Sequence, residues 1–202
     1  LEKIISKLVD PKLVNTLEAQ HDKAVLKRQE VVAMFSDIRS FSKLSGIYPP
    51  HDVVEMINGF MNYTNREIDK YGGVVDKYAG DQVMALWGVP DTSESDYFNS
   101  VKAAIHLRKA LTDFNSDREE SGKFPISVGM GLHCGDSIVG EIGSDRRANF
   151  TAIGPTINIA ARIESACPAL STDILISEDL YLRVKNDVAV CDEGVIPFKG
   201  ID

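Results

Sequence analysis

Hydrophobic positions along the first half of the chain follow two periods, one typical of strands and one typical of helices. A β-branched apolar run at 30–35 predicts a central strand, and apolar residues at helical spacing predict a helix over 50–70. Two short apolar runs, 74–79 and 82–87, predict a β-hairpin. This half of the chain is therefore predicted to run strand, helix, strand, strand.

The second half of the chain repeats the alternation. A polar loop at 91–95 predicts the start of a second long helix, and two strands are expected within 124–140, joined by a turn at 135–136. A strand near 149–153, a helix over 155–166 and a small αβ tail follow. The order βαββαβ indicates an α+β fold with a ferredoxin-like core, a palm-like antiparallel sheet with helices, plus a C-terminal αβ extension.

Residues 1–28 have a different character from the rest of the chain. Their apolar residues predict two amphipathic helical pieces, interrupted at Asp10-Pro11 because proline breaks a helix. The chain begins with Leu rather than Met. We therefore expect a helical connector from a longer protein over 1–28 and one catalytic domain over 29–202, with upstream regulatory domains in the full-length protein.

Composition narrows the possible partners and compartments. With 202 residues, 44% of them hydrophobic, the chain can build one ordinary core. The formal charge of −8 argues against a nucleic-acid surface but leaves room for a phosphorylated ligand whose charge is neutralised by metal ions. Three widely spaced cysteines predict neither a disulfide framework nor a zinc site. We expect a reducing, cytoplasmic location for this domain, and the sequence is compatible with a full-length protein that is membrane-associated.

Two aspartates stand where predicted strands end in turns. Asp37 ends the first strand, and Asp81 lies between the two hairpin strands. Carboxylates from adjacent strands can hold a pair of divalent cations, and the backbone carbonyl of Ile38 can add an oxygen ligand. The alternatives are a helix N-cap for Asp37 and an ordinary Gly-Asp turn for Asp81.

Three further polar residues lie in apolar surroundings. Lys77 in the hairpin is expected to face a groove or an interface, or else to pair with Asp76 or snorkel to solvent. Asn158 and Arg162 are four residues apart and share one helical face, from which they can contact a ribose and a phosphate. Their alternative is a polar pair with a carboxylate such as Glu164.

Together these motifs resemble the catalytic domain of class III nucleotidyl cyclases, of the bacterial adenylyl cyclase kind. The resemblance covers roughly residues 30–200, and the helical lead-in also resembles the connector that often precedes this domain. It rests on the ordered set Phe35-Ser36-Asp37-Ile38 with Phe41, Lys77-Tyr78-Ala79-Gly80-Asp81, Gly131-Leu132-His133-Cys134-Gly135 with Gly140 and Gly143-Ser144, and Asn158 with Arg162.

The resemblance implies an adenylate cyclase that converts ATP to 3′,5′-cyclic AMP and pyrophosphate by a two-metal mechanism. Asp37, Asp81 and the Ile38 carbonyl match the ligands of two Mg²⁺ ions, for which Mn²⁺ can substitute. Asn158 and Arg162 match the residues that orient the ribose and stabilise the transition state.

Base and phosphate recognition are also implied by the resemblance. Lys77 and Thr151 match the adenine-binding residues, and Lys199 matches a lysine that contacts the terminal phosphates. Many adenylyl cyclases have Asp where this chain has Thr151; the threonine is similar to a subgroup that responds to bicarbonate or CO₂. Lys77 as a donor favours ATP over GTP.

The family resemblance further implies a homodimer with two active sites shared between chains. Asp37 and Asp81 would come from one chain, and Lys77, Thr151, Asn158 and Arg162 from the other. Two alternatives are a guanylyl cyclase and a catalytically inactive nucleotide-binding dimerisation module. A third, a diguanylate-cyclase-like enzyme, is disfavoured because the hairpin lacks an acidic pair after Gly72-Gly73.

Overall fold

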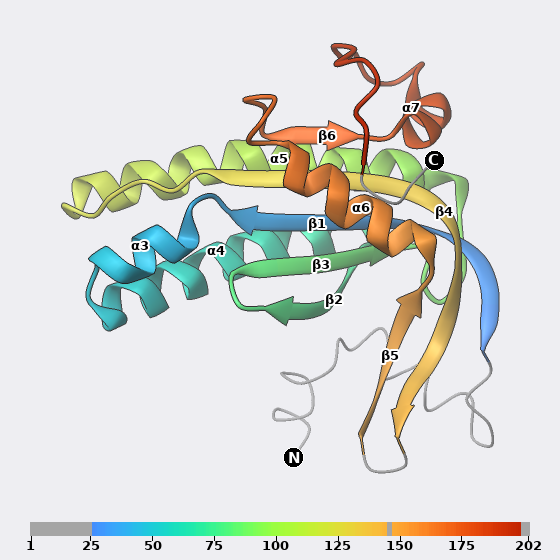
Figure 1. Cartoon of the computed structure of the whole chain (residues 1–202), viewed down its shortest axis with the longest axis horizontal. Coiled ribbons are helices and arrows are strands. Elements are labelled where there is room, and N and C mark those ends of the chain that lie inside the picture. The colour runs from blue at the N-terminus through green and yellow to red at the C-terminus, as the bar shows by residue number, and fades with distance from the viewer. Residues whose placement is uncertain (1–25, 145–146, 199–202) are drawn as a thin grey trace.

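The computed structural model describes residues 26–144 and 147–198 of the chain (Figure 1). The connector expected over 1–28 lies almost wholly outside the described residues, and so does Lys199. The elements in chain order are β1 (Lys27–Ile38), α3 (Phe41–Ile47), α4 (Pro50–Lys70), β2 (Val74–Ala79), β3 (Gln82–Trp87), α5 (Glu94–Glu120), β4 (Val128–Ser144), β5 (Arg147–Ile153), α6 (Pro155–Ala166), β6 (Ile174–Ile176) and α7 (Glu178–Val184).

The sheet has the order β2-β3-β1-β4-β5, and all neighbours on this path are antiparallel. The short strand β6 adds to β4 in parallel. Helices α4 and α5 cover one face of the sheet and α6 packs on the other (Figure 1). This arrangement confirms the predicted α+β fold with a ferredoxin-like core, and β6 with α7 forms the predicted C-terminal extension.

The central strand β1 is buried on both faces. Val32 and Met34 belong to the core beneath α4 and α5, whereas Ala33 and Phe35 belong to the core beneath α6. A strand buried on both sides needs apolar residues at successive positions, which explains the unbroken hydrophobic run in the sequence. No helix among the described residues is long and apolar enough to cross a membrane.

The two helices behind the sheet form as their sequences predict. Helix α4 begins with Pro50 in its first turn, where the missing proline N–H is not needed, and buries Val53, Met56 and Phe60 at helical spacing. Helix α5 begins with a capping box, in which Ser93 and Asp96 each accept a backbone N–H at the helix start.

Strand β4 corrects one prediction. The expected turn at Gly135–Asp136 lies inside a single 17-residue strand. Gly135 pairs with Val31 and Asp136 with Glu30, so the ladder with β1 runs straight through the position of the expected turn. Continuous pairing with a long partner strand outweighs the local turn preference of Gly-Asp.

Helix α6 lies unusually close to β4, and glycine makes this possible. A Cβ atom on Gly131 would stand 2.0 Å from the backbone N of Glu164, and one on Gly129 would stand 3.0 Å from Glu164 Oε1. The first contact involves backbone, which cannot swing aside. The position of α6, and of every side chain it carries, therefore depends on the absence of a side chain at Gly131.

Replacing Gly131 with Ala should destabilise the fold by about 1–3 kcal/mol, because the methyl group must push α6 away from β4. Urea denaturation measures the loss. Gly46→Ala is the matched control: Gly46 lies in α3 with open space around it, so alanine is expected to stabilise by about 0.5–1 kcal/mol. Equal stability of Gly131→Ala and the wild-type protein would contradict the close-packing argument.

Candidate active site

The sheet register brings Asp37 and Asp81 to the same end of neighbouring strands. Asp37 is the penultimate residue of β1, and Asp81 lies in the two-residue turn between β2 and β3. The pairing of Ser36 with Val83 aligns the end of β1 with this turn. The N-cap of the following helix α3 is Ser40. Asp37 is thus not the N-cap that was the alternative explanation for it.

The two carboxyl groups repel each other. Burial, followed by hydrogen bonding with Asp81 and the charges of Asp81 and Glu164, raises the pKa of Asp37 to about 8. Glu164 projects from α6 and is buried, with its own pKa raised by that burial. One buried oxygen on each aspartate, Asp37 Oδ1 and Asp81 Oδ2, lacks a hydrogen-bond partner. The pair therefore needs a positive charge.

A divalent cation fits this requirement. Two carboxylates with free buried oxygens offer the hard ligands that Mg²⁺ and Mn²⁺ prefer, and Mg²⁺ takes only one or two carboxylates from a protein. In the described part of the chain, no group of three or more His, Cys, Asp or Glu is arranged to hold a metal ion. The remaining ligands would be main-chain oxygen, substrate phosphates and water. Ile38 is buried at the end of β1, and the role of its carbonyl stays a prediction.

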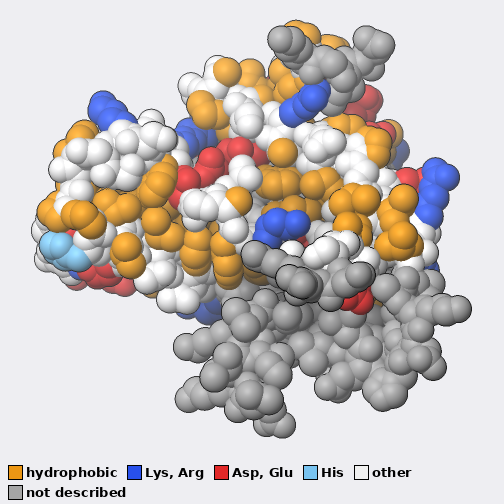
Figure 2. Space-filling model, turned by 60° about the horizontal axis from the view of Figure 1, so that its bottom comes forward, with side chains coloured by type: hydrophobic (Ala, Val, Ile, Leu, Met, Phe, Trp, Pro, Cys, Tyr) orange, Lys and Arg blue, Asp and Glu red, His pale blue; other side chains and the backbone are white. Residues whose placement is uncertain are grey.

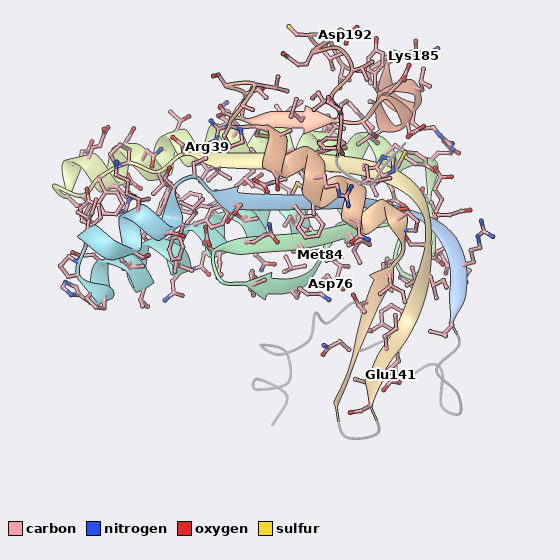
Figure 3. The ribbon with its side chains drawn as sticks, viewed as in Figure 1. Arg39, Asp76, Met84, Glu141, Lys185 and Asp192 are labelled. Atoms are coloured by element: carbon pink, nitrogen blue, oxygen red, sulfur yellow. The ribbon has the colours of Figure 1, made fainter. Side chains whose placement is uncertain are left out.

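A second polar group joins the hairpin to β5. Lys77 Nζ lies 3.3 Å from Thr151 Oγ1 and 3.0 Å from Asp76 Oδ2. The ion pair with Asp76 was one of the alternatives for Lys77, and the structure contains it together with the contact to Thr151. The Lys77 side chain remains 48% exposed, so its ammonium group can still reach a ligand. Figure 3 shows Asp76 on β2, on the side where β5 approaches.

Helix α6 carries the third group. Asn158 is exposed and Arg162 is partly buried, one helical turn apart. Arg162 lines a cavity of about 500 Å³ together with Phe198 and other residues near the end of the described chain. Lys199 follows directly but lies outside the described residues.

Within one chain the structure therefore brings together Asp37 with Asp81, and Lys77 with Thr151. Two neighbouring carboxylates were not predicted as site residues. Glu164 was weighed only as a partner of Asn158 and Arg162. It follows Arg162 by two residues and therefore lies on another face of the same helix, and this spacing was the available sequence signal. Asp76 was weighed only as an ion-pair partner of Lys77.

A cavity of about 830 Å³ lies elsewhere. It is lined by β4, the start of α6 and α7, and none of the predicted site residues borders it. Its arginines are already paired, Arg28 with Asp136 and Arg183 with Glu30. Because these charges are neutralised, the cavity has no evident preference for a phosphorylated ligand.

Replacing Asp37 with Asn should stabilise the metal-free protein at pH 8 by at least about 1 kcal/mol, and by less as the pH falls. The pKa of Asp37 is raised above its ordinary 3.8, so the folded state holds this proton more tightly than the unfolded state. Its contribution to stability is complete below about pH 4 and is lost as the pH rises through about 8. Urea denaturation in EDTA from pH 5 to 9 measures the difference.

The matched control for this experiment is Asp113→Asn, at an exposed site on α5. We expect it to change stability by less than about 0.5 kcal/mol at every pH. An Asp37→Asn effect that is independent of pH would contradict the proposed charge repulsion.

Comparison with known proteins places this chain in a family. The sequence model described as "Adenylate and Guanylate cyclase catalytic domain" matches residues 24–202. Adenylate cyclase 1 of Rhizobium meliloti is 30% identical over 173 residues, which are 86% of this chain and 26% of that protein. The chain thus spans about a quarter of this relative's length.

Solved structures agree with this assignment. The adenylyl cyclase CyaB from P. aeruginosa is 32% identical with a TM-score of 0.81, covering 88% of this chain and 91% of that one. The guanylyl cyclase Cya2 is 27% identical with the same TM-score, covering 87% and 88%. Both cyclase types thus share this fold, and members of the family generally use divalent metal ions. The chain belongs to the family of adenylate and guanylate cyclase catalytic domains, the class III nucleotidyl cyclases.

Proposed function

We propose that this domain is an adenylate cyclase that converts ATP to 3′,5′-cyclic AMP and pyrophosphate in a homodimer. The observation that carries the proposal is the half-buried Asp37–Asp81 pair, in which one buried oxygen of each carboxyl group has no hydrogen-bond partner and which fits divalent cations. Adenylate cyclases are among the relatives, at 30% identity or more. In this reaction the ribose 3′-hydroxyl attacks the α-phosphorus, the bond to the β-phosphate oxygen breaks, and the hydroxyl proton passes to solvent.

The metal ions in this proposal are Mg²⁺, two per site, with Mn²⁺ as a substitute. Asp37 and Asp81 hold them, and the Ile38 carbonyl completes the protein's share of ligands. When bound, such ions supply Lewis-acid activation of the hydroxyl and neutralise charge on the triphosphate.

The chain's other residues bind and orient the nucleotide. Lys77 donates to a ring nitrogen of adenine, and Thr151 accepts from its amino group. Asn158 orients the ribose, and Arg162 balances the charge that develops on the α-phosphoryl oxygens. Lys199 contacts the terminal phosphates. Bicarbonate or CO₂ as an effector and upstream regulatory domains are part of the same proposal and rest on the resemblance.

A second copy of the chain completes each site in this proposal. Large apolar side chains are exposed on the sheet strands, including Tyr78 at 47%, Ile138 at 43% and Ile153 at 48%. Hydrophobic side chains also gather across the middle of the face in Figure 2, beside acidic ones. Surfaces of this kind often mark protein–protein contacts.

A guanylyl cyclase is the second candidate, because the fold is shared with the guanylyl cyclase Cya2. Thr151 keeps this candidate open, since a hydroxyl group can donate to the guanine carbonyl as well as accept from adenine. Assays with ATP and GTP in parallel decide between the two.

Mixing two inactive variants tests catalysis and the shared site together. Asp37→Ala and Asn158→Ala should each lose cyclic AMP formation from ATP and Mg²⁺. Their equimolar mixture should recover about a quarter of wild-type activity, because half the dimers are mixed and each mixed dimer has one intact site. Cyclic AMP is the measured product.

The control mixture pairs Asp37→Ala with Asp81→Ala. Both variants lack a metal ligand, so no mixed dimer contains an intact site and no recovery is expected. Recovery in the control mixture, or none in the Asp37→Ala with Asn158→Ala mixture, would refute a site shared between chains. A wild-type protein that forms no cyclic nucleotide would refute the proposed activity itself.

A further inference from the structure

The carboxyl group of Asp76 is buried in an unexpected place. Asp76 belongs to β2, which lies at one edge of the sheet, yet its side chain is only 1% exposed. Charged side chains are almost never fully buried unless they are paired. Burial raises the pKa of Asp76, and hydrogen bonding by Thr151 and the charge of Lys77 counteract that rise. The two residues that act on this carboxylate, Thr151 and Lys77, are thus the same two that are proposed to contact the adenine base.

A β-bulge produces this arrangement. In a regular strand Asp76 and Lys77 would point to opposite faces of the sheet. The ladder between β2 and β3 shifts register between Val75 and Lys77, and Asp76 is the extra residue. The bulge brings both side chains to one place, where Lys77 Nζ lies 3.0 Å from Asp76 Oδ2. Bulges often redirect side chains next to active sites.

Thr151 sits between two groups with fixed hydrogen-bonding roles. An ammonium group only donates, an ionised carboxylate only accepts, and a hydroxyl group does both. Lys77 Nζ donates to Thr151 Oγ1 over 3.3 Å. Both oxygens of the Asp76 carboxylate are buried without a hydrogen-bond partner, and Thr151 lies near enough to lower the pKa of this carboxyl group, so Asp76 is the unsatisfied acceptor to which the Thr151 hydroxyl proton can turn. Thr151 is 5% exposed, so water has little access to compete for this proton.

A threonine with its proton held in this way can only accept a further hydrogen bond. Adenine carries an amino group at C6, which donates, whereas guanine carries a carbonyl oxygen there, which accepts. A freely rotating hydroxyl group would serve both bases, but a fixed one serves adenine alone. With guanine bound, the buried hydroxyl group and the guanine carbonyl would both be acceptors and would stay unpaired, and this cost makes the discrimination between the two bases strong.

We propose that Asp76 is a positioning residue that fixes the direction of the Thr151 hydroxyl group and thereby makes the site select ATP over GTP. This inference rests on the proposed function, in which Lys77 and Thr151 contact the base. Asp76 supplies, from β2 at the other end of the strand order, the charge that an aspartate at position 151 would otherwise provide.

The test compares kcat/KM for ATP and GTP in Asp76→Asn. Asparagine keeps the shape but adds an amide donor, so the Thr151 proton is free to turn towards guanine. We expect the ATP-to-GTP ratio of kcat/KM to fall by about tenfold, which corresponds to the loss of one oriented hydrogen bond. Asp113→Asn, the same chemical change at an exposed site, should leave the ratio unchanged.

Thr151→Val provides a second, independent variant. It removes the hydroxyl group, so it should lower the ratio as well, and adding Asp76→Asn to it should have no further effect on the ratio. A purely structural role of Asp76 would lower activity on both nucleotides alike and leave the ratio intact. Urea denaturation of each variant separates a folding defect from a change of preference.

The possible outcomes are distinct. An active wild-type protein whose ratio is unchanged in both Asp76→Asn and Thr151→Val overturns this inference and leaves the proposed function standing. Independent, additive effects of the two substitutions on the ratio also overturn it. A wild-type protein that forms no cyclic nucleotide from either substrate overturns the proposed function and this inference with it.

Discussion

Strand β1 lies at the centre of the sheet, hydrogen-bonded to β3 along one edge and to β4 along the other, with both faces buried. This double pairing allows its sequence almost no freedom of register, because a slip of one residue would exchange its two apolar faces. The end of β1 is therefore fixed against the β2–β3 turn, and Asp37 against Asp81. The geometry of the candidate site follows from the pairing of the most buried strand.

That fixed geometry holds together two groups that repel each other. A folded protein without metal must bury charged oxygens or keep a proton on Asp37, and the raised pKa reflects the second solution. Such strain is common where function requires a group that is unfavourable for the fold alone. Glu164 adds to it from α6, which Gly131 allows to lie directly on β4. A bound cation would convert this repulsion into attraction.

The sequence predicted most elements because local and long-range preferences agree in them. The helix over 50–70 and the hairpin strands 74–79 and 82–87 have the expected bounds, since glycine or proline ends each of them or lies beside them. The predicted turn at Gly135–Asp136 was wrong, because pairing of β4 with β1 overrides the turn preference there. The short helix α3 was not predicted. Its seven residues bury no side chain completely, so it leaves no clear apolar pattern.

The candidate site was predictable to a different degree. Strand ends and the hairpin turn were visible in the sequence, and therefore so was the meeting of Asp37 and Asp81. Lys77 and Thr151 lie on β2 and β5, the two ends of the strand order β2-β3-β1-β4-β5. Their contact requires β5 to reach the β2–β3 hairpin, and no local sequence pattern encodes this. The bulge at Asp76 is likewise a product of the folded ladder. Sequence alone could name these residues only by resemblance.

The central claim is that Asp37 and Asp81 are held together without a counter-charge until a divalent cation binds. The most direct measurement is the pH titration of the Asp37 carboxyl carbon by NMR, with and without Mg²⁺. The predicted midpoint lies far above the ordinary 3.8, near 8, without Mg²⁺, and it falls when Mg²⁺ is added. A midpoint near 3.8 that Mg²⁺ does not change would contradict the claim.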